Sequence, residues 1–131
     1  MALDVKKELK INFILGFIVL IYYGLWLFIS YESWVAVHNW PLFDPAAGRY
    51  LGGVFIAWAL IALKVLRELD NWEKVENWII FSVIVNILGL ISFIISIIFY
   101  TTNPIGIINL IIAIFFAALG IHILIQKRKE K

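Results

Sequence analysis

Six residues that stand close together in the chain are of types that could bind an anion or move a proton. They are Glu32, His38, Trp40, Asp44, Arg49 and Tyr50. An arginine guanidinium binds phosphate or carboxylate through paired hydrogen bonds, and the aromatic rings could form the walls of such a site. The histidine and the glutamate could act as acid or base. The segment therefore predicts a site for an anionic or amphiphilic ligand at one mouth of the protein, with catalysis as a further hypothesis.

A structural interpretation of the same residues stays open. Arg49 could form a salt bridge with Asp44 or Glu32 and so fasten this segment to the rest of the protein. An aspartate directly before a proline, as in Asp44-Pro45, is typical of the start of a helix, where the carboxylate caps the first turn. The aromatic residues of the segment match the belt of Trp and Tyr found at membrane–water interfaces.

The rest of the sequence has no pattern of a catalytic or metal site. It contains no nucleophile–base–orienter set, no zinc-ligand spacing and no phosphate-binding loop. The chain has no cysteine, which excludes disulfides, thiolate catalysis and iron–sulfur ligation. Its two histidines, His38 and His122, lie on opposite sides of the membrane in the topology predicted below. We therefore expect no metal and no cofactor, and assign no catalytic residue.

The composition is that of a membrane protein. Of 131 residues, 63% are hydrophobic and 15% are charged, and the mean hydropathy is +0.97. A soluble domain of this size could not bury so much apolar surface. About 20 apolar residues cross a hydrocarbon core of about 30 Å. We therefore predict an all-α, single-domain bundle of four transmembrane helices over residues 1–131, with spans at 11–31, 47–69, 74–100 and 105–126.

The connections and the orientation follow from the same pattern. Residues 32–46 are expected to form a loop, and Thr101–Pro104 a turn, with Asn103 as a cap and Pro104 as the first helical residue. Ten of the eleven Lys and Arg residues precede the first span, flank the second loop or follow the fourth span. Basic residues favour the cytoplasmic side, which places both termini in the cytoplasm, with the chain in the cell membrane.

Arg49 is the exception, at the mouth of a second span whose charge-free part, residues 50–63, is short for a bilayer. The other basic residues stand where topology requires them, so we expect membrane lipids and no nucleic acid as partners.

Small and polar residues indicate how the helices pack. In lipid, helix contacts are marked by small side chains and by hydrogen-bonding ones. The second span offers Gly48 with Gly52 and Gly53 with Ala57, the third Ser82, Asn86 and Gly89, and the fourth Asn109, Ala113 and Ala117. These faces predict contacts within the bundle, with a second copy or with a partner in a membrane complex. For the two asparagines, hydrogen bonds between helices and a polar pathway are both open interpretations.

The segment WPLFDPAAGRYLGG resembles the first loop of uncharacterised small four-helix integral membrane proteins. The resemblance is carried by Trp40, Pro41, Leu42, Asp44, Pro45, Arg49 and Gly52. It implies the four-helix architecture and brings no activity with it. Three functions remain as hypotheses: a non-catalytic component of an oligomer or assembly, a transporter or binding protein for an amphiphilic or anionic molecule, and a membrane-embedded enzyme that acts on a lipid.

Overall fold

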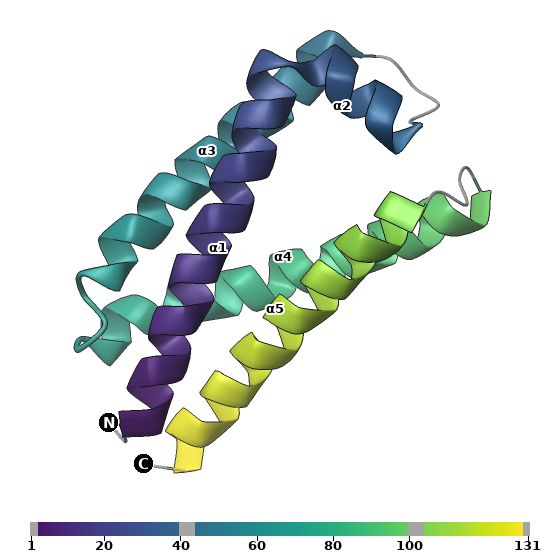
Figure 1. Cartoon of the computed structure of the whole chain (residues 1–131). Helices are drawn as coiled ribbons and strands as arrows, with labels where there is room; N and C mark the ends of the chain where they lie inside the picture. The colour runs from purple at the N-terminus through teal and green to yellow at the C-terminus, as the bar shows by residue number, and fades with distance from the viewer. Residues whose placement is uncertain (1–2, 40–43, 100–103, 130–131) are drawn as a thin grey trace.

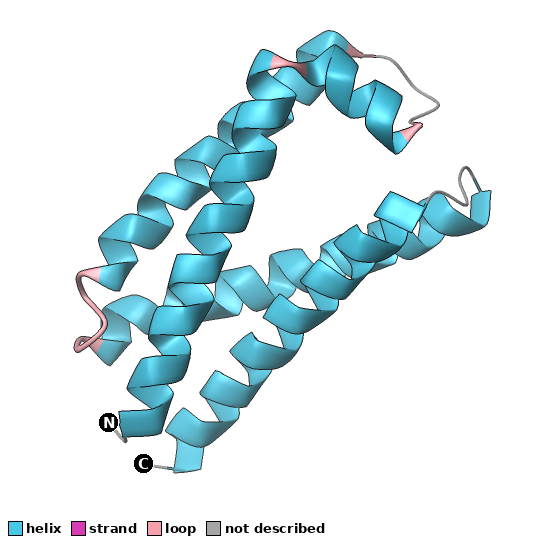
Figure 2. Ribbon diagram, viewed as in Figure 1, coloured by secondary structure: helices cyan, strands magenta, loops and turns pink. Residues whose placement is uncertain are grey.

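The protein is entirely helical over the residues that the structure describes. A computed structural model describes residues 3–39, 44–99 and 104–129. The helices are α1 (Leu3–Ile29), α2 (Tyr31–His38), α3 (Pro45–Leu66), α4 (Trp72–Phe99) and α5 (Pro104–Lys129), as Figures 1 and 2 show. All except α2 are long and apolar enough to cross a membrane. The predicted all-α class is thus confirmed.

The predicted loop at 32–46 was wrong in its first half, because it contains the helix α2. Ser30 leaves the helical conformation (φ −131°, ψ 53°), and this ends α1. The chain then has no glycine or proline before Pro41, so nothing prevents a second helix from forming. This helix ends at Asn39, whose left-handed conformation (φ 49°, ψ 46°) is one that asparagine tolerates better than most residues.

The start of α3 follows the predicted capping pattern. The Asp44 carboxylate accepts a hydrogen bond of 3.0 Å from the backbone N–H of Ala47, and Pro45 occupies the first turn. At 1.5 Å per residue, the 22 residues of α3 extend about 33 Å, so only its charge-free part is short. Helix α5 begins at Pro104 as predicted, whereas the expected Asn103 cap and the rest of that turn lie outside the described residues.

The four long helices form two pairs instead of a regular bundle. Helix α1 packs along α3, and α4 packs along α5, while contacts between the pairs are fewer and involve mainly α1 and α5. In Figure 1 the pairs converge where both termini lie and diverge towards α2. We call these two ends of the molecule the termini end and the α2 end.

The fully buried core lies at the termini end. Leu9, Val75, Ile79 and Ile123 come from α1, α4 and α5 and have no exposed surface. Polar contacts surround this core: Lys6 forms an ion pair with Asp70 in the turn after α3, and the Glu8 carboxylate on α1 lies 3.4 Å from the His122 ring on α5. Lys6 holds the pKa of the Asp70 carboxyl below its usual value. The two pairs are thus joined at the termini end by hydrophobic packing and by the contact of Glu8 with His122.

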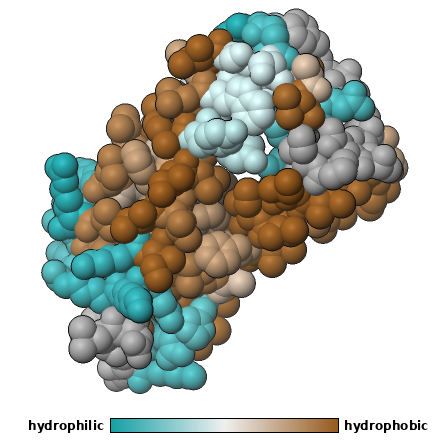
Figure 3. Space-filling model, viewed as in Figure 1, coloured by the Kyte–Doolittle hydropathy of each residue, from teal (hydrophilic) through white to brown (hydrophobic). Residues whose placement is uncertain are grey.

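The outer surface is apolar between two polar ends. Figure 3 shows hydrophobic side chains across the middle of the molecule and hydrophilic ones towards both ends. Isoleucines, leucines and phenylalanines are exposed along all four long helices. Such a large continuous apolar surface is unfavourable in water and suits a lipid environment.

Helices α1 and α3 approach each other closely at two glycines. A Cβ atom at Gly52 would lie 2.6 Å from the backbone nitrogen of Phe28 and 2.8 Å from the carbonyl oxygen of Gly24. A Cβ at Gly24 would lie 3.0 Å from the backbone nitrogen of Ile56. Backbone atoms cannot yield to such contacts, so this crossing requires glycine on both helices.

Candidate functional site

The charged residues of the 32–50 segment are engaged with one another at the α2 end. Arg49 on α3 donates a hydrogen bond of 2.8 Å to the Glu32 carboxylate on α2, and both side chains remain partly exposed. The pKa of Glu32 is lowered by its own backbone N–H and then by the Arg49 guanidinium. Of the two partners that the sequence allowed for Arg49, the structure therefore has Glu32, and the ion pair ties α2 to α3.

The other residues of the predicted anion site do not gather around Arg49. Asp44 caps α3, and the Tyr50 side chain is 77% exposed. Trp40 lies outside the described residues. The Arg49 guanidinium is thus hydrogen-bonded to a carboxylate of the same chain, that of Glu32.

His38 has a different environment from the one expected of an exposed loop. Its side chain is only 6% exposed and lies among aromatic rings. It stacks on Trp34 with ring centroids 4.3 Å apart, and the Trp26 and Tyr23 centroids are 5.4 and 6.5 Å away. Burial lowers the pKa of His38 from 6.5, so the imidazole is neutral at pH 7.

The hydrogen bonding of His38 determines which ring nitrogen carries the proton. Nδ1 lies 2.9 Å from the carbonyl oxygen of Trp34. A carbonyl can only accept, so Nδ1 must donate, and Nε2 of the neutral ring retains a lone pair. Nε2 is buried, and within the described residues it has no hydrogen-bond partner. An acceptor left in this way costs free energy unless a donor reaches it.

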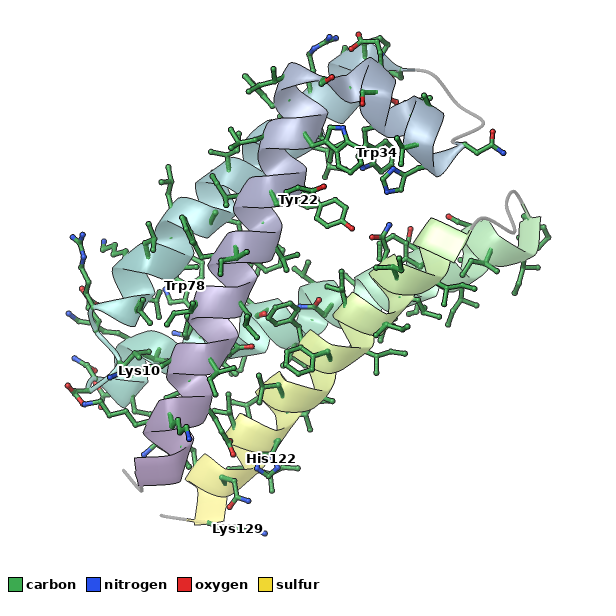
Figure 4. All side chains as sticks on the ribbon, in the orientation of Figure 1. Lys10, Tyr22, Trp34, Trp78, His122 and Lys129 are labelled. Carbon is green, nitrogen blue, oxygen red and sulfur yellow. The ribbon has the colours of Figure 1, made fainter. Side chains whose placement is uncertain are left out.

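His38 lines a cavity of about 600 Å³ between the two helix pairs. All five helices contribute to the lining, which is largely apolar and contains no Lys, Arg, Asp or Glu among the described residues. In Figure 4 the Trp34 side chain lies on the side of α2 that faces α5. The lining residues with polar side-chain atoms are Asn12, Tyr23, Trp34, His38, Trp58, Trp78, Ser82, Asn86, Ser92, Ser96 and Asn109. A cavity of this size and character is typical of sites for small organic ligands.

Two polar residues of the lining come from opposite pairs and bond to each other. The Tyr23 hydroxyl on α1 donates a hydrogen bond of 2.7 Å to Oδ1 of Asn109 on α5. Asn86, by contrast, donates to the carbonyl oxygen of Ser82 on its own helix, at 2.7 Å. The hydrogen bonds between helices that the sequence suggested for both asparagines are therefore present at Asn109, whereas the Asn86 amide bonds within α4.

Asn12 contributes a second buried acceptor to the cavity. Its side chain is only 4% exposed, and its Oδ1 atom has no hydrogen-bond partner within the described residues. Asn12 and Tyr23 are eleven residues apart on α1, which places them about 16 Å apart along the helix axis. Because the His38 ring centroid lies 6.5 Å from that of Tyr23, His38 and Asn12 are far apart along the cavity.

The small residues predicted as helix contacts fall into three groups. Gly52 faces α1, and Gly48 faces α2, where a Cβ at Gly48 would overlap the Tyr31 ring. Gly53 meets only the Phe28 ring at an ordinary 3.8 Å, and Ala57 is exposed. The polar and small residues of α4 and α5 face inward: Ser82, Asn86, Gly89, Asn109 and Ala113 line the cavity, and Ala117 is buried.

Sequence reasoning missed two contributors to this site. Tyr23 was not singled out within the first span, and Trp34 belongs to the segment whose aromatic residues matched an interfacial belt, yet both line the cavity. A signal was present on α1, because Asn12, Gly16, Tyr23 and Leu27 follow one another at helical spacing and so share a face.

A comparison of the chain with protein-family models, curated proteins and solved structures found no match.

Proposed function

We propose that this chain is an integral membrane protein that binds an amphiphilic molecule in the cavity between its two helix pairs. One observation carries the proposal: His38 and Asn12 line a largely apolar cavity of about 600 Å³, and within the described residues His38 Nε2 and Asn12 Oδ1 are buried acceptors that have no hydrogen-bond partner. An apolar chain fits such a lining, and a polar group of the same molecule would satisfy an acceptor. The cavity is partly open, so the molecule could enter from the bilayer.

The distribution of charge supports an orientation in the cell membrane. Among the described residues, every Lys and Arg except Arg49 belongs to the start of α1, the α3–α4 connection with its flanking turns, or the end of α5. These segments meet at the termini end, which Figure 4 marks with Lys10, His122 and Lys129. The positive-inside tendency then favours a cytoplasmic termini end and an outward-facing α2 end.

The contacts of the glycines bear on the alternative role as an assembly component. Gly48 and Gly52 are used within the chain, where Gly48 lies against Tyr31 of α2 and Gly52 brings α3 against α1. This GxxxG pair is therefore not available to a second copy. The enzyme hypothesis has less support, because the carboxylate of Glu32 bonds to Arg49 while His38 bonds to a backbone carbonyl.

The proposal is tested by filling the cavity. Gly89 lines it, and a Cβ there would meet only Phe93 of the same helix, at 3.9 Å, so leucine can enter the free space. Three photoreactive probes share a hexadecyl chain and end in an alcohol, a methyl ether or a carboxylic acid. In phosphatidylcholine nanodiscs, at least one probe should label cavity residues saturably in the wild type and should fail to do so in Gly89→Leu.

Ala118→Leu is the matched control, because it adds the same side chain to an exposed position on α5 outside the cavity lining. This variant should be labelled like the wild type. Equal labelling of Gly89→Leu and Ala118→Leu would refute the proposal, as would the absence of saturable labelling by all three probes.

A further inference from the structure

The cavity itself indicates which polar group its ligand carries. His38 lines the cavity, and its buried Nε2 can only accept a hydrogen bond, because the other ring nitrogen donates to the Trp34 carbonyl. The fitting group on a ligand is therefore a hydrogen-bond donor. Hydroxyls, amide N–H groups and ammonium groups donate, whereas ethers, esters and carboxylates only accept. An amide also brings a carbonyl that needs a donor of its own, so a hydroxyl is the simpler fit.

Charge separates the remaining candidates. Among the described residues, the cavity lining holds no carboxylate to pair with an ammonium group and no guanidinium or ammonium to pair with an anion. Arg49, the cation at this end of the molecule, is bonded to Glu32 and does not line the cavity. A charge buried among apolar side chains without a partner is strongly unfavourable. The donor must therefore be uncharged.

We infer that the ligand is an uncharged membrane alcohol, a long-chain or polycyclic molecule whose hydroxyl donates its hydrogen to His38 Nε2 while its apolar body lies between the helix pairs. The inference rests on the proposed function and specifies the substrate class of the same cavity. The surrounding rings suit this role, since Trp34 stacks on the imidazole and Trp26 lies beside it, which fixes the plane of the ring. The hydroxyl of Tyr23 is bonded to Asn109 and leaves the imidazole to the ligand.

The test compares three competitors that differ only in the polar group. Photoreactive hexadecanol labels the protein in phosphatidylcholine nanodiscs, and unlabelled hexadecanol, 1-methoxyhexadecane or hexadecanoic acid is added at equal mole fractions in the membrane. The alcohol should compete about tenfold better than the ether, which corresponds to about 1.4 kcal/mol. The ether has the same chain but no hydrogen to donate. The acid should compete less well than the alcohol at pH 7.

Two histidine variants test whether His38 causes the preference for the alcohol over the ether. His38→Phe keeps an aromatic ring on Trp34 but removes the acceptor, so the alcohol and the ether should then compete equally. His122→Phe is the control, because His122 lies at the termini end beside Glu8 and outside the cavity lining. This control should keep the wild-type ratio.

The outcomes separate this inference from the proposed function. Equal competition by alcohol and ether in the wild type, or stronger competition by the acid, would overturn the alcohol assignment while saturable labelling still supported an amphiphile site. These two results need no variant, so they hold even where His38→Phe folds poorly. An unchanged alcohol preference in well-folded His38→Phe would also overturn the assignment. If labelling by the photoreactive alcohol never saturates, because His38 is hydrogen-bonded only to water, the proposed function itself is refuted.

Discussion

The crossing of α1 and α3 gives a stringent test of the fold, because two adjacent glycines should respond in opposite directions. In Gly52→Ala the new methyl group would lie 2.6 Å from the nitrogen of Phe28 and 2.8 Å from the oxygen of Gly24. Both are backbone atoms, so the helices must separate by most of an ångström. Overpacking of this kind costs about 1–3 kcal/mol. In Gly53→Ala the methyl group meets only the Phe28 ring, at 3.8 Å.

Both substitutions replace glycine by alanine inside the same helix, so both receive the same gain in helix propensity, up to about 1 kcal/mol. The difference between the variants therefore reports the backbone clash alone. We expect Gly52→Ala to be less stable than Gly53→Ala by about 1–3 kcal/mol. The free energy of unfolding in mixed micelles titrated with sodium dodecyl sulfate, followed by tryptophan fluorescence, measures it. Equal stability of the two variants would show that α1 and α3 do not cross at these residues.

Three further predictions concern the α2 end. Tyr23→Phe should destabilise the protein by about 0.6 kcal/mol, typical of a hydrogen bond between helices in a membrane, and a double-mutant cycle with Asn109→Ala should show coupling, whereas simple additivity would contradict the bond. Glu32→Gln should lower stability slightly at low salt and have no effect at high salt, and combining it with Arg49→Gln should add nothing; a persistent loss at high salt would argue against an exposed ion pair. Because burial lowers the pKa of His38 from 6.5, the unfolded chain binds the proton first, so stability should fall as pH drops from 6.5 towards the lower folded value; unfolding free energies between pH 8 and 5.5 should show this slope in the wild type and less of it in His38→Phe.

The helices were largely predictable because their signals are local. Long apolar runs interrupted by charges fix the spans to within three residues at each end, apart from the basic start of α1. The Asp44-Pro45 cap was also predictable, since it depends on two adjacent residues. Helix α2 was missed because aromatic and polar residues near a span suggest an interface loop, although the segment contains no helix breaker. The orientation in a membrane and the resemblance to other small four-helix proteins stay predictions.

The candidate site was predictable only in part, because it depends on which helices pair. The sequence restricted Arg49 to two carboxylate partners and could not choose between them, since that choice depends on the direction in which α2 leaves α1. It placed His38 at an exposed mouth, whereas the turn of α2 brings the imidazole over the cavity. The cavity itself exists because α1 pairs with α3 and α4 with α5. Glycines determine where α1 and α3 cross, but the sequence does not indicate which helix a given glycine will contact.

Unequal packing along the molecule explains why the cavity lies where it does. At the termini end, fully buried Leu9, Ile79 and Ile123 draw α1, α4 and α5 together. Towards the α2 end, the residues that α4 turns to the interior include several small or polar ones, Ser82, Asn86, Gly89, Ser92 and Ser96, and among the described residues the Tyr23–Asn109 hydrogen bond joins the two pairs there. A Cβ at Gly89 would meet only its own helix, so no neighbouring helix requires a glycine at this position. A small residue that no helix contact requires, in a cavity whose lining holds acceptors without partners among the described residues, suits a binding cavity better than a packing interface.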